Sequence, residues 1–95
     1  MNKYEIMYIV KANLDEEARK AEIEKVNGYV KANNAKVVNV DEKLGLRELA
    51  YPINDEIKGY YVVLKVESTS ALIEFDRLMK LDKNVLRHLI TVDQD

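Results

Sequence analysis

The stretch YEIMYIV, residues 4–10, decides how the rest of the chain can fold. In a β-strand its side chains alternate between two faces, and apolar residues occur on both of them. Apolar side chains on both faces are typical of a strand inside a sheet rather than at its edge. The sequence therefore predicts a central strand at this position.

The residues that follow this strand predict a helix. Asn13 is the expected N-cap, because Glu16 follows three residues later and completes a capping box. Apolar residues then recur at helical spacing to about Ala32, where Asn33 and Asn34 predict the end of the helix. The stripe expected to face the core comprises Ala18, Ala21, Ile23, Val26, Tyr29 and Val30.

Two strands are expected after the helix. The first covers residues 36–49, with a bulge at Gly45 where the alternation of apolar residues changes phase. Pro52 has no N–H to donate and is expected to end the pairing, so that residues 54–56 form a turn. Residues 59–66 predict the second strand.

A second helix and a last strand complete the pattern. Residues 68–70, Ser-Thr-Ser, are the expected cap of the helix, and residues 85–92 predict the strand. The order β-α-β-β-α-β predicts one ferredoxin-like α+β domain over residues 1–95, with a four-stranded antiparallel sheet and two helices on one face. The apolar stripe of the second helix comprises Ala71, Leu72, Phe75, Leu78 and Met79.

In this fold the helices leave one face of the sheet open. The alternation directs Tyr4, Ile6, Tyr8, Tyr60, Val62 and Leu64 toward the helices. Several apolar side chains then remain on the open face, and such a face more often marks a protein contact than bare exposure to solvent. The candidate partner-binding residues are Met7, Ile9, Tyr61 and Val63.

Composition and motifs argue against catalysis. The chain has no cysteine and a single histidine, His88, and it lacks the glycine-rich phosphate loops and the serine-hydrolase motif. We expect no enzymatic activity, no metal and no cofactor. The N-terminal apolar run is too short and too charged for a signal peptide or a membrane span, which predicts a cytoplasmic protein with no membrane contact.

The net charge restricts how the chain can bind nucleic acid. Fifteen basic and seventeen acidic side chains give a net charge of −2, whereas a protein that binds nucleic acid alone is usually basic. RNA binding would need a local patch or a basic partner. Tyrosines could equally be half-buried core residues, arginines could merely solubilise, and a lone strand histidine is usually structural. The candidate RNA-binding residues are Lys3, Tyr4, Arg47, Tyr51, Arg87 and His88.

Four motifs resemble one known family. GLRELAYPI at residues 45–53 is followed closely by KGYYVVLKVES at residues 58–68, and the chain opens with KYE at residues 3–5 and ends with NVLRH at residues 84–88. Together they resemble the bacterial small-subunit ribosomal protein S6 family (bS6), over nearly the whole chain. Many members of the family have a basic residue where this chain has Glu48, which weakens the patch around Arg47.

The resemblance implies a ferredoxin-like structural component of the 30S ribosomal subunit, without catalytic activity and with no small-molecule substrate. It also implies binding to the central domain of 16S ribosomal RNA, as a heterodimer with the small basic ribosomal protein S18. A basic partner would account for an acidic protein on RNA. The alternative is a small-molecule-binding or regulatory module of the same fold that dimerises through its open sheet face.

Overall fold

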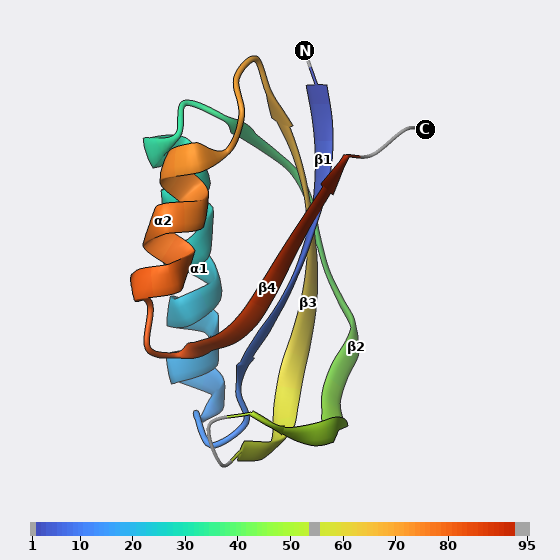
Figure 1. Ribbon diagram of the computed structural model, residues 1–95. Coiled ribbons are helices and arrows are strands. Elements are labelled where there is room, and N and C mark those ends of the chain that lie inside the picture. Colours follow the sequence, from blue (N-terminus) through green and yellow to red (C-terminus); the bar gives the residue numbers. More distant parts are fainter. Residues whose placement is uncertain (1, 54–55, 93–95) are drawn as a thin grey trace.

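The computed structural model describes residues 2–53 and 56–92, and these residues form two layers (Figure 1). All paired strands are antiparallel, their order in the sheet is β2-β3-β1-β4, and both helices lie against one face. This arrangement confirms the predicted ferredoxin-like α+β fold. The elements are β1 (Asn2–Lys11), α1 (Glu16–Ala32), β2 (Lys36–Ile53), β3 (Glu56–Ser68), α2 (Ile73–Leu81) and β4 (Val85–Val92).

The core lies between the sheet and the two helices. As predicted, β1 is central: it pairs with β3 on one side and with β4 on the other. The alternation along β1 and β3 directs the expected side chains to the helices, with Tyr4 and Tyr60 packed at the margin of the core. The core comprises Ile6, Tyr8, Val10, Ile23, Val26, Val30, Val62, Leu64, Val66, Leu72, Phe75 and Met79.

Helix α1 begins two residues later than predicted and buries a different set of side chains. Its N-cap is Asp15 rather than Asn13, and the Asp15 carboxylate accepts a hydrogen bond from the Ala18 backbone N–H at 2.7 Å. Ala18 and Ala21 are exposed, whereas the Glu22 side chain is buried. The reason is that polar groups from distant segments surround Glu22, as described below.

The β2–β3 hairpin is longer than its sequence suggests. Gly45 has a φ of 58° and lies at a register shift, which confirms the predicted bulge. The prediction that Pro52 ends the pairing is wrong, because β2 continues to Ile53, which pairs with Glu56. β2 is an edge strand, where a missing N–H on the outer side removes no ladder bond. The predicted turn covered residues 54–56, but Glu56 already belongs to β3, and residues 54 and 55 lie outside the described residues.

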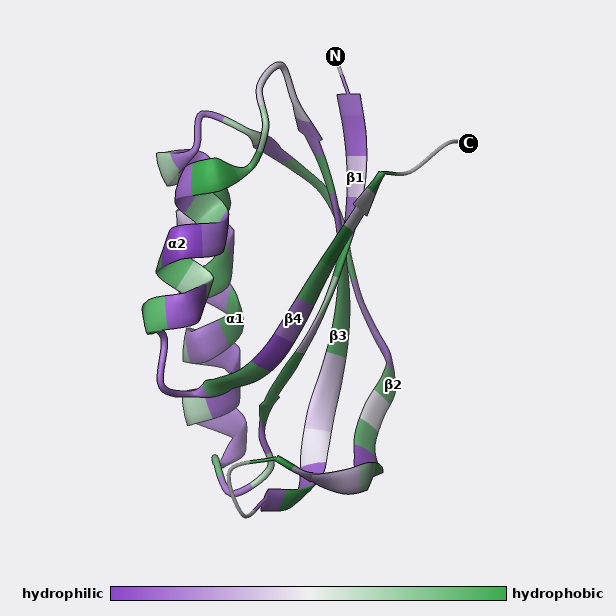
Figure 2. Ribbon diagram, in the orientation of Figure 1, coloured by the Kyte–Doolittle hydropathy of each residue, from purple (hydrophilic) through white to green (hydrophobic). Residues whose placement is uncertain are grey.

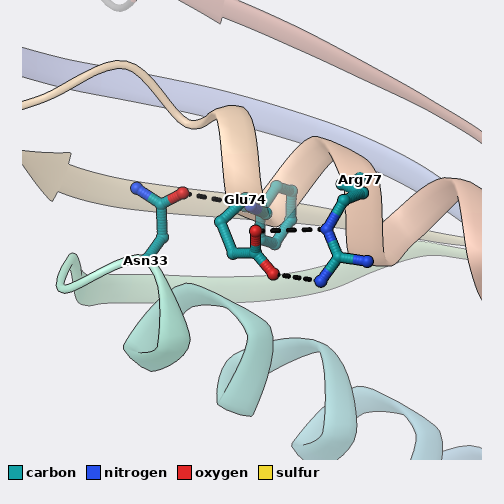
Figure 3. A network of polar contacts seen from close by, with 4 residues as sticks. Asn33, Glu74 and Arg77 are labelled. Atoms are coloured by element: carbon teal, nitrogen blue, oxygen red, sulfur yellow. Dashed lines mark hydrogen bonds and ion pairs between the residues drawn. The ribbon is translucent and has the colours of Figure 1, made fainter.

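The N-terminus of α2 is capped from the other helix. The predicted Ser-Thr-Ser cap is wrong: Ser68 belongs to β3, and Leu72, at the N-cap position, makes no side-chain capping bond. Instead, the Asn33 Oδ1 atom accepts a hydrogen bond from the Phe75 backbone N–H at 3.0 Å (Figure 3). The Asn33 Nδ2 atom donates to the Ala71 carbonyl at 3.3 Å. One buried amide at the C-cap of α1 therefore satisfies a donor and an acceptor at the start of α2.

Asn33→Ala tests this bridge. The substitution leaves the Phe75 N–H without its acceptor in a buried place, so we expect the free energy of unfolding to fall by about 1–3 kcal/mol. The measurement is urea denaturation followed by circular dichroism.

Asn27→Ala in α1 is the matched control, because the buried Asn27 Oδ1 has no hydrogen-bond partner among the described residues. Its removal should cost much less, and Asn33→Asp, which keeps the acceptor, should retain part of the lost stability. Equal losses in Asn33→Ala and Asn27→Ala would contradict the bridge.

Candidate functional site

The open face of the sheet carries a band of apolar side chains. Register places Met7 opposite Val63 on β3 and opposite Leu89 on β4, so these three side chains share the open face. Met7 and Val63 are half-buried, as is Tyr61, while Leu89 is 56% exposed. The sequence reasoning missed Leu89, although the alternation along residues 85–92 would have placed it beside Met7.

Ile9 is the exception in this band. The prediction that Ile9 lies on an uncovered face is wrong, because its side chain is only 6% exposed. Ile9 lies over Gly59, where an added Cβ would come within 2.3 Å of the Ile9 Cγ2 atom and 3.4 Å of the Leu49 Cδ2 atom. The absence of a side chain at Gly59 therefore lets β2, β3 and Ile9 pack closely at this end of the sheet.

The end of β2 crosses the open face and reaches β4. In Figure 1 the last part of β2 turns sharply and runs across the lower end of the sheet. There the Arg87 Nη1 atom donates a hydrogen bond to the Tyr51 hydroxyl at 2.5 Å, and the guanidinium carbon lies 5.5 Å from the centre of the Tyr51 ring. Tyr51 is 54% exposed, so the pair presents an aromatic ring and a cation to solvent.

Arg47 belongs to the same face as this pair. It pairs in register with Gly59, and its Nε atom donates to the Leu44 carbonyl at 2.9 Å, which fixes part of an exposed side chain. The neighbouring Glu48 pairs with Lys58 and points to the opposite side of the hairpin. Glu48 therefore does not share a face with Arg47, and its negative charge lies on the other side of the hairpin.

Lys3 and Tyr4 lie at the opposite end of β1. Lys3 is six positions before Ile9, which in a strand is roughly 20 Å. Lys3 is exposed on the open face, whereas the half-buried Tyr4 packs against the core from the helix side. The six candidate RNA-binding residues thus do not form one cluster: Tyr51 and Arg87 are in contact on the open face, Arg47 shares that face on the edge strand β2, and Lys3 lies apart from them.

His88 points away from Arg87, toward the helices. Its side chain is 12% exposed, and its Nε2 atom lies 2.6 Å from the Asp76 Oδ1 atom of α2. The hydrogen bonds from His88 and Lys80 hold the pKa of Asp76 below its ordinary value. Figure 2 shows a hydrophilic stretch between hydrophobic stretches of β4. Strand alternation puts Arg87 and His88 on opposite faces of the sheet. The side chain of His88 thus serves to join β4 to α2.

A second polar cluster is buried between α1 and the segment before β4. Asp82 accepts hydrogen bonds from the Tyr29 hydroxyl at 2.9 Å and from the Asn84 backbone N–H at 3.0 Å. Glu22 accepts a longer bond from the Asn84 side chain, at 3.4 Å, and its other carboxyl oxygen has no partner among the described residues. The fully buried hydroxyl of Tyr8 has none there either.

The two carboxyl groups in this cluster titrate differently. Burial, reinforced by the neighbouring carboxylate of Asp82, raises the pKa of Glu22 from 4.5 to about 7. Burial alone would also raise the pKa of Asp82, but the neighbouring polar groups, among them the donors of Asn84 and Tyr29, lower it overall. Glu22 therefore keeps its proton to a higher pH than an exposed glutamate, whereas the pKa of the neighbouring Asp82 is lowered.

Within residues 2–53 and 56–92, no three carboxylate or imidazole side chains gather in a way that could hold a metal ion. Neither described helix is long and apolar enough to cross a membrane.

Fold and surface together define a class: a ferredoxin-like α+β protein whose open sheet face combines apolar, aromatic and cationic side chains. Residues 3–91 match the model of the family Ribosomal protein S6. The small ribosomal subunit protein bS6 of Shouchella clausii is 48% identical over 95 residues, which cover 99% of each chain. The chain belongs to the ribosomal protein S6 family, and is thus a structural component of the small ribosomal subunit and not an enzyme.

Solved structures agree with the fold. The crystal structure of 30S ribosomal protein S6 from Thermotoga maritima matches with a TM-score of 0.88 and 23% identity, over 97% of this chain and 87% of that one. A chain in the complex of the chemotaxis kinase CheA P2 domain with CheY, from the same organism, matches with a TM-score of 0.67 and 16% identity, over 97% and 98% of the two chains. The same fold thus occurs in a chemotaxis complex, so the fold by itself does not decide the function.

Gly59→Ala tests the close packing beneath the β2–β3 hairpin. The new methyl group would clash with Ile9, so we expect a loss of about 1–3 kcal/mol in the free energy of unfolding. In an Ile9→Ala background the same change should cost less, and a double-mutant cycle in urea would measure the coupling.

Gly28→Ala is the control, because an added Cβ there has no atom within 4 Å, and it should stabilise α1 by up to about 1 kcal/mol. A neutral Gly59→Ala, or an unchanged cost in the Ile9→Ala background, would contradict the packing.

Glu22→Gln tests the raised pKa of Glu22. A raised pKa means that the folded state holds its proton more tightly than the unfolded state, so this stability is complete below about pH 4.5 and is lost as pH rises through about 7. Between pH 5 and pH 8 we expect the wild type to lose on the order of 2 kcal/mol through this group.

Glutamine resembles the protonated form of glutamate. In Glu22→Gln the Tm of thermal unfolding should therefore fall less between pH 5 and pH 8 than it does in the wild type. Glu24→Gln, at an exposed position of the same helix, should keep the wild-type decline. Parallel pH profiles for wild type and Glu22→Gln would exclude Glu22 as the titrating group.

Proposed function

We propose that this chain binds the central domain of 16S ribosomal RNA as a heterodimer with the basic ribosomal protein S18. Membership of the ribosomal protein S6 family is the observation that carries the proposal. The net charge of −2 supports the need for a partner, since a cationic protein would supply most of the counterion release that drives RNA binding.

The open sheet face divides into two parts that suit two ligands. Met7, Tyr61 and Val63, together with the exposed Leu89, form an apolar band of the kind found at the centre of protein interfaces. Arg87 and Tyr51 lie beside this band, and can bond to phosphate and stack on an unpaired base. We therefore assign the band to S18 and the Arg87–Tyr51 pair to RNA.

The remaining candidates take different roles in this proposal. Arg47 adds a cation on the same face, and Lys3 provides a separate contact at the far end of β1. Tyr4 and His88 are turned toward the helices, so we infer that they hold β1 and β4 in place for their neighbours. Ile9 likewise supports the hairpin from below rather than touching the partner.

Arg87→Ala tests the RNA contact. Loss of one phosphate contact should weaken the complex of RNA, partner and this chain, and should reduce the slope of log affinity against log salt by about 0.7–0.9. The measurement is filter binding at several salt concentrations.

Arg77→Ala removes an equal charge from α2, where Arg77 pairs with Glu74, and should leave the slope unchanged. Equal slopes for wild type and Arg87→Ala would remove Arg87 from the RNA surface.

Met7→Glu tests the partner contact. A carboxylate in the apolar band should weaken the heterodimer at least tenfold, because it would be buried without a partner. Calorimetric titration with S18 in the absence of RNA measures this directly. Ile73→Glu alters an exposed apolar residue on α2 and should have little effect. Unchanged affinity of Met7→Glu, or self-association of the chain through this band, would favour the dimeric module instead.

A further inference from the structure

A groove lies at the end of the molecule where β1 ends and β4 begins. Its walls come from the last residue of β1, the end of α2, the segment before β4 and the first residues of β4. Its volume is about 570 Å³. Four cationic side chains from these elements line it: Lys11, Lys80, Lys83 and Arg87. We call this feature the basic groove.

Two acidic residues also line the basic groove, but one of them is turned inward. Both carboxyl oxygens of Asp82 accept hydrogen bonds, from Tyr29 and from the Asn84 backbone, and the residue is buried. Glu56, at the start of β3, is the other. The cations thus outnumber the acids by two to one in a chain whose net charge is −2. The basic groove is therefore a local departure from the overall charge.

The four cationic side chains differ in whether they already form an ion pair or a hydrogen bond within the molecule. The Lys80 Nζ atom lies 2.9 Å from the Asp76 Oδ2 atom, so its charge is largely compensated. Arg87 contacts Tyr51 through one guanidinium nitrogen, which leaves its other donors available. Lys11 and Lys83 lie on different elements, at the end of β1 and before β4, and the groove brings them together.

We propose that the basic groove holds phosphodiester groups of RNA, so that the RNA surface continues from the open sheet face around this end of the molecule. This inference rests on the proposed function and adds a second place of contact to it. Lysines supply charge without reading bases, which is typical of backbone contacts that position RNA. Arg87 connects the two places, since it both lines the groove and contacts Tyr51 on the open face.

Charge favours RNA over the protein partner as the occupant. S18 is basic and would be repelled by a groove in which cations predominate. A free phosphate ion shares the chemistry of the phosphodiester group, so the experiment has to separate these two sources.

The test is the salt dependence of RNA binding by Lys11→Gln/Lys83→Gln in the presence of S18. Loss of two phosphate contacts should reduce the salt slope by about 1.4–1.8. The fall in affinity between 50 and 200 mM salt should then be about tenfold smaller than for the wild type. Thermal denaturation of the variant checks that it is folded, and Lys83→Gln alone, on the exposed segment before β4, should give about half the effect.

Lys20→Gln is the matched control, because Lys20 pairs with Glu16 on the exposed side of α1, and its slope should equal that of the wild type. A wild-type slope in the double variant would overturn the inference while leaving the proposed function intact. Failure of the wild type to bind RNA with S18 would overturn both. If inorganic phosphate shifts the amide resonances of Lys11 and Lys83 while the RNA slope is unchanged, the groove is a small-anion site, and the RNA assignment is wrong.

Discussion

The close packing of Ile9 on Gly59 sets the path of the β2–β3 hairpin, and the contacts on the open sheet face depend on that path. With no Cβ at Gly59, the Ile9 methyl group occupies the space that a side chain would fill. The end of β2 can then cross two strands and place Tyr51 against Arg87 of β4. An aromatic ring and a cation that are 36 residues apart in sequence thus meet beside the apolar band.

The two faces of the sheet use polar side chains in different ways. On the helix side, His88 and Asp76 join β4 to α2, and Asp82 accepts hydrogen bonds from Tyr29 and from the Asn84 backbone. The hydrogen bonds of these side chains are made within the molecule. On the open side Arg87 keeps unused donors. Arg87 and His88 are successive residues of one strand and therefore face opposite sides of the sheet: Arg87 is exposed on the open face, and His88 contacts α2.

The sequence predicted what depends on local periodicity and missed what depends on distant partners. Strand alternation correctly assigned the core face of β1 and β3, and the phase change located the bulge at Gly45. Strand alternation could not show that the hairpin packs over Ile9. That packing depends on the missing side chain of Gly59, which is on another strand. Of the candidate site, Arg47, Tyr51 and Arg87 do lie on one face. The contact between His88 and Asp76, and the buried contact between Glu22 and Asn84, join segments that are distant in sequence, so periodicity could not predict them.

The amide of Asn33 has a consequence for how the two halves of the chain depend on each other. Helix α2 has nine residues, fewer than the roughly 12–15 that an isolated helix needs to persist in water. An acceptor for its first turn belongs to α1, 42 residues earlier. Helix α2 therefore gains this stabilisation only when the end of α1 is in place. Since β3 lies between β1 and β2 in the sheet, the first half of the chain has no paired strands of its own, so neither half is complete without the other.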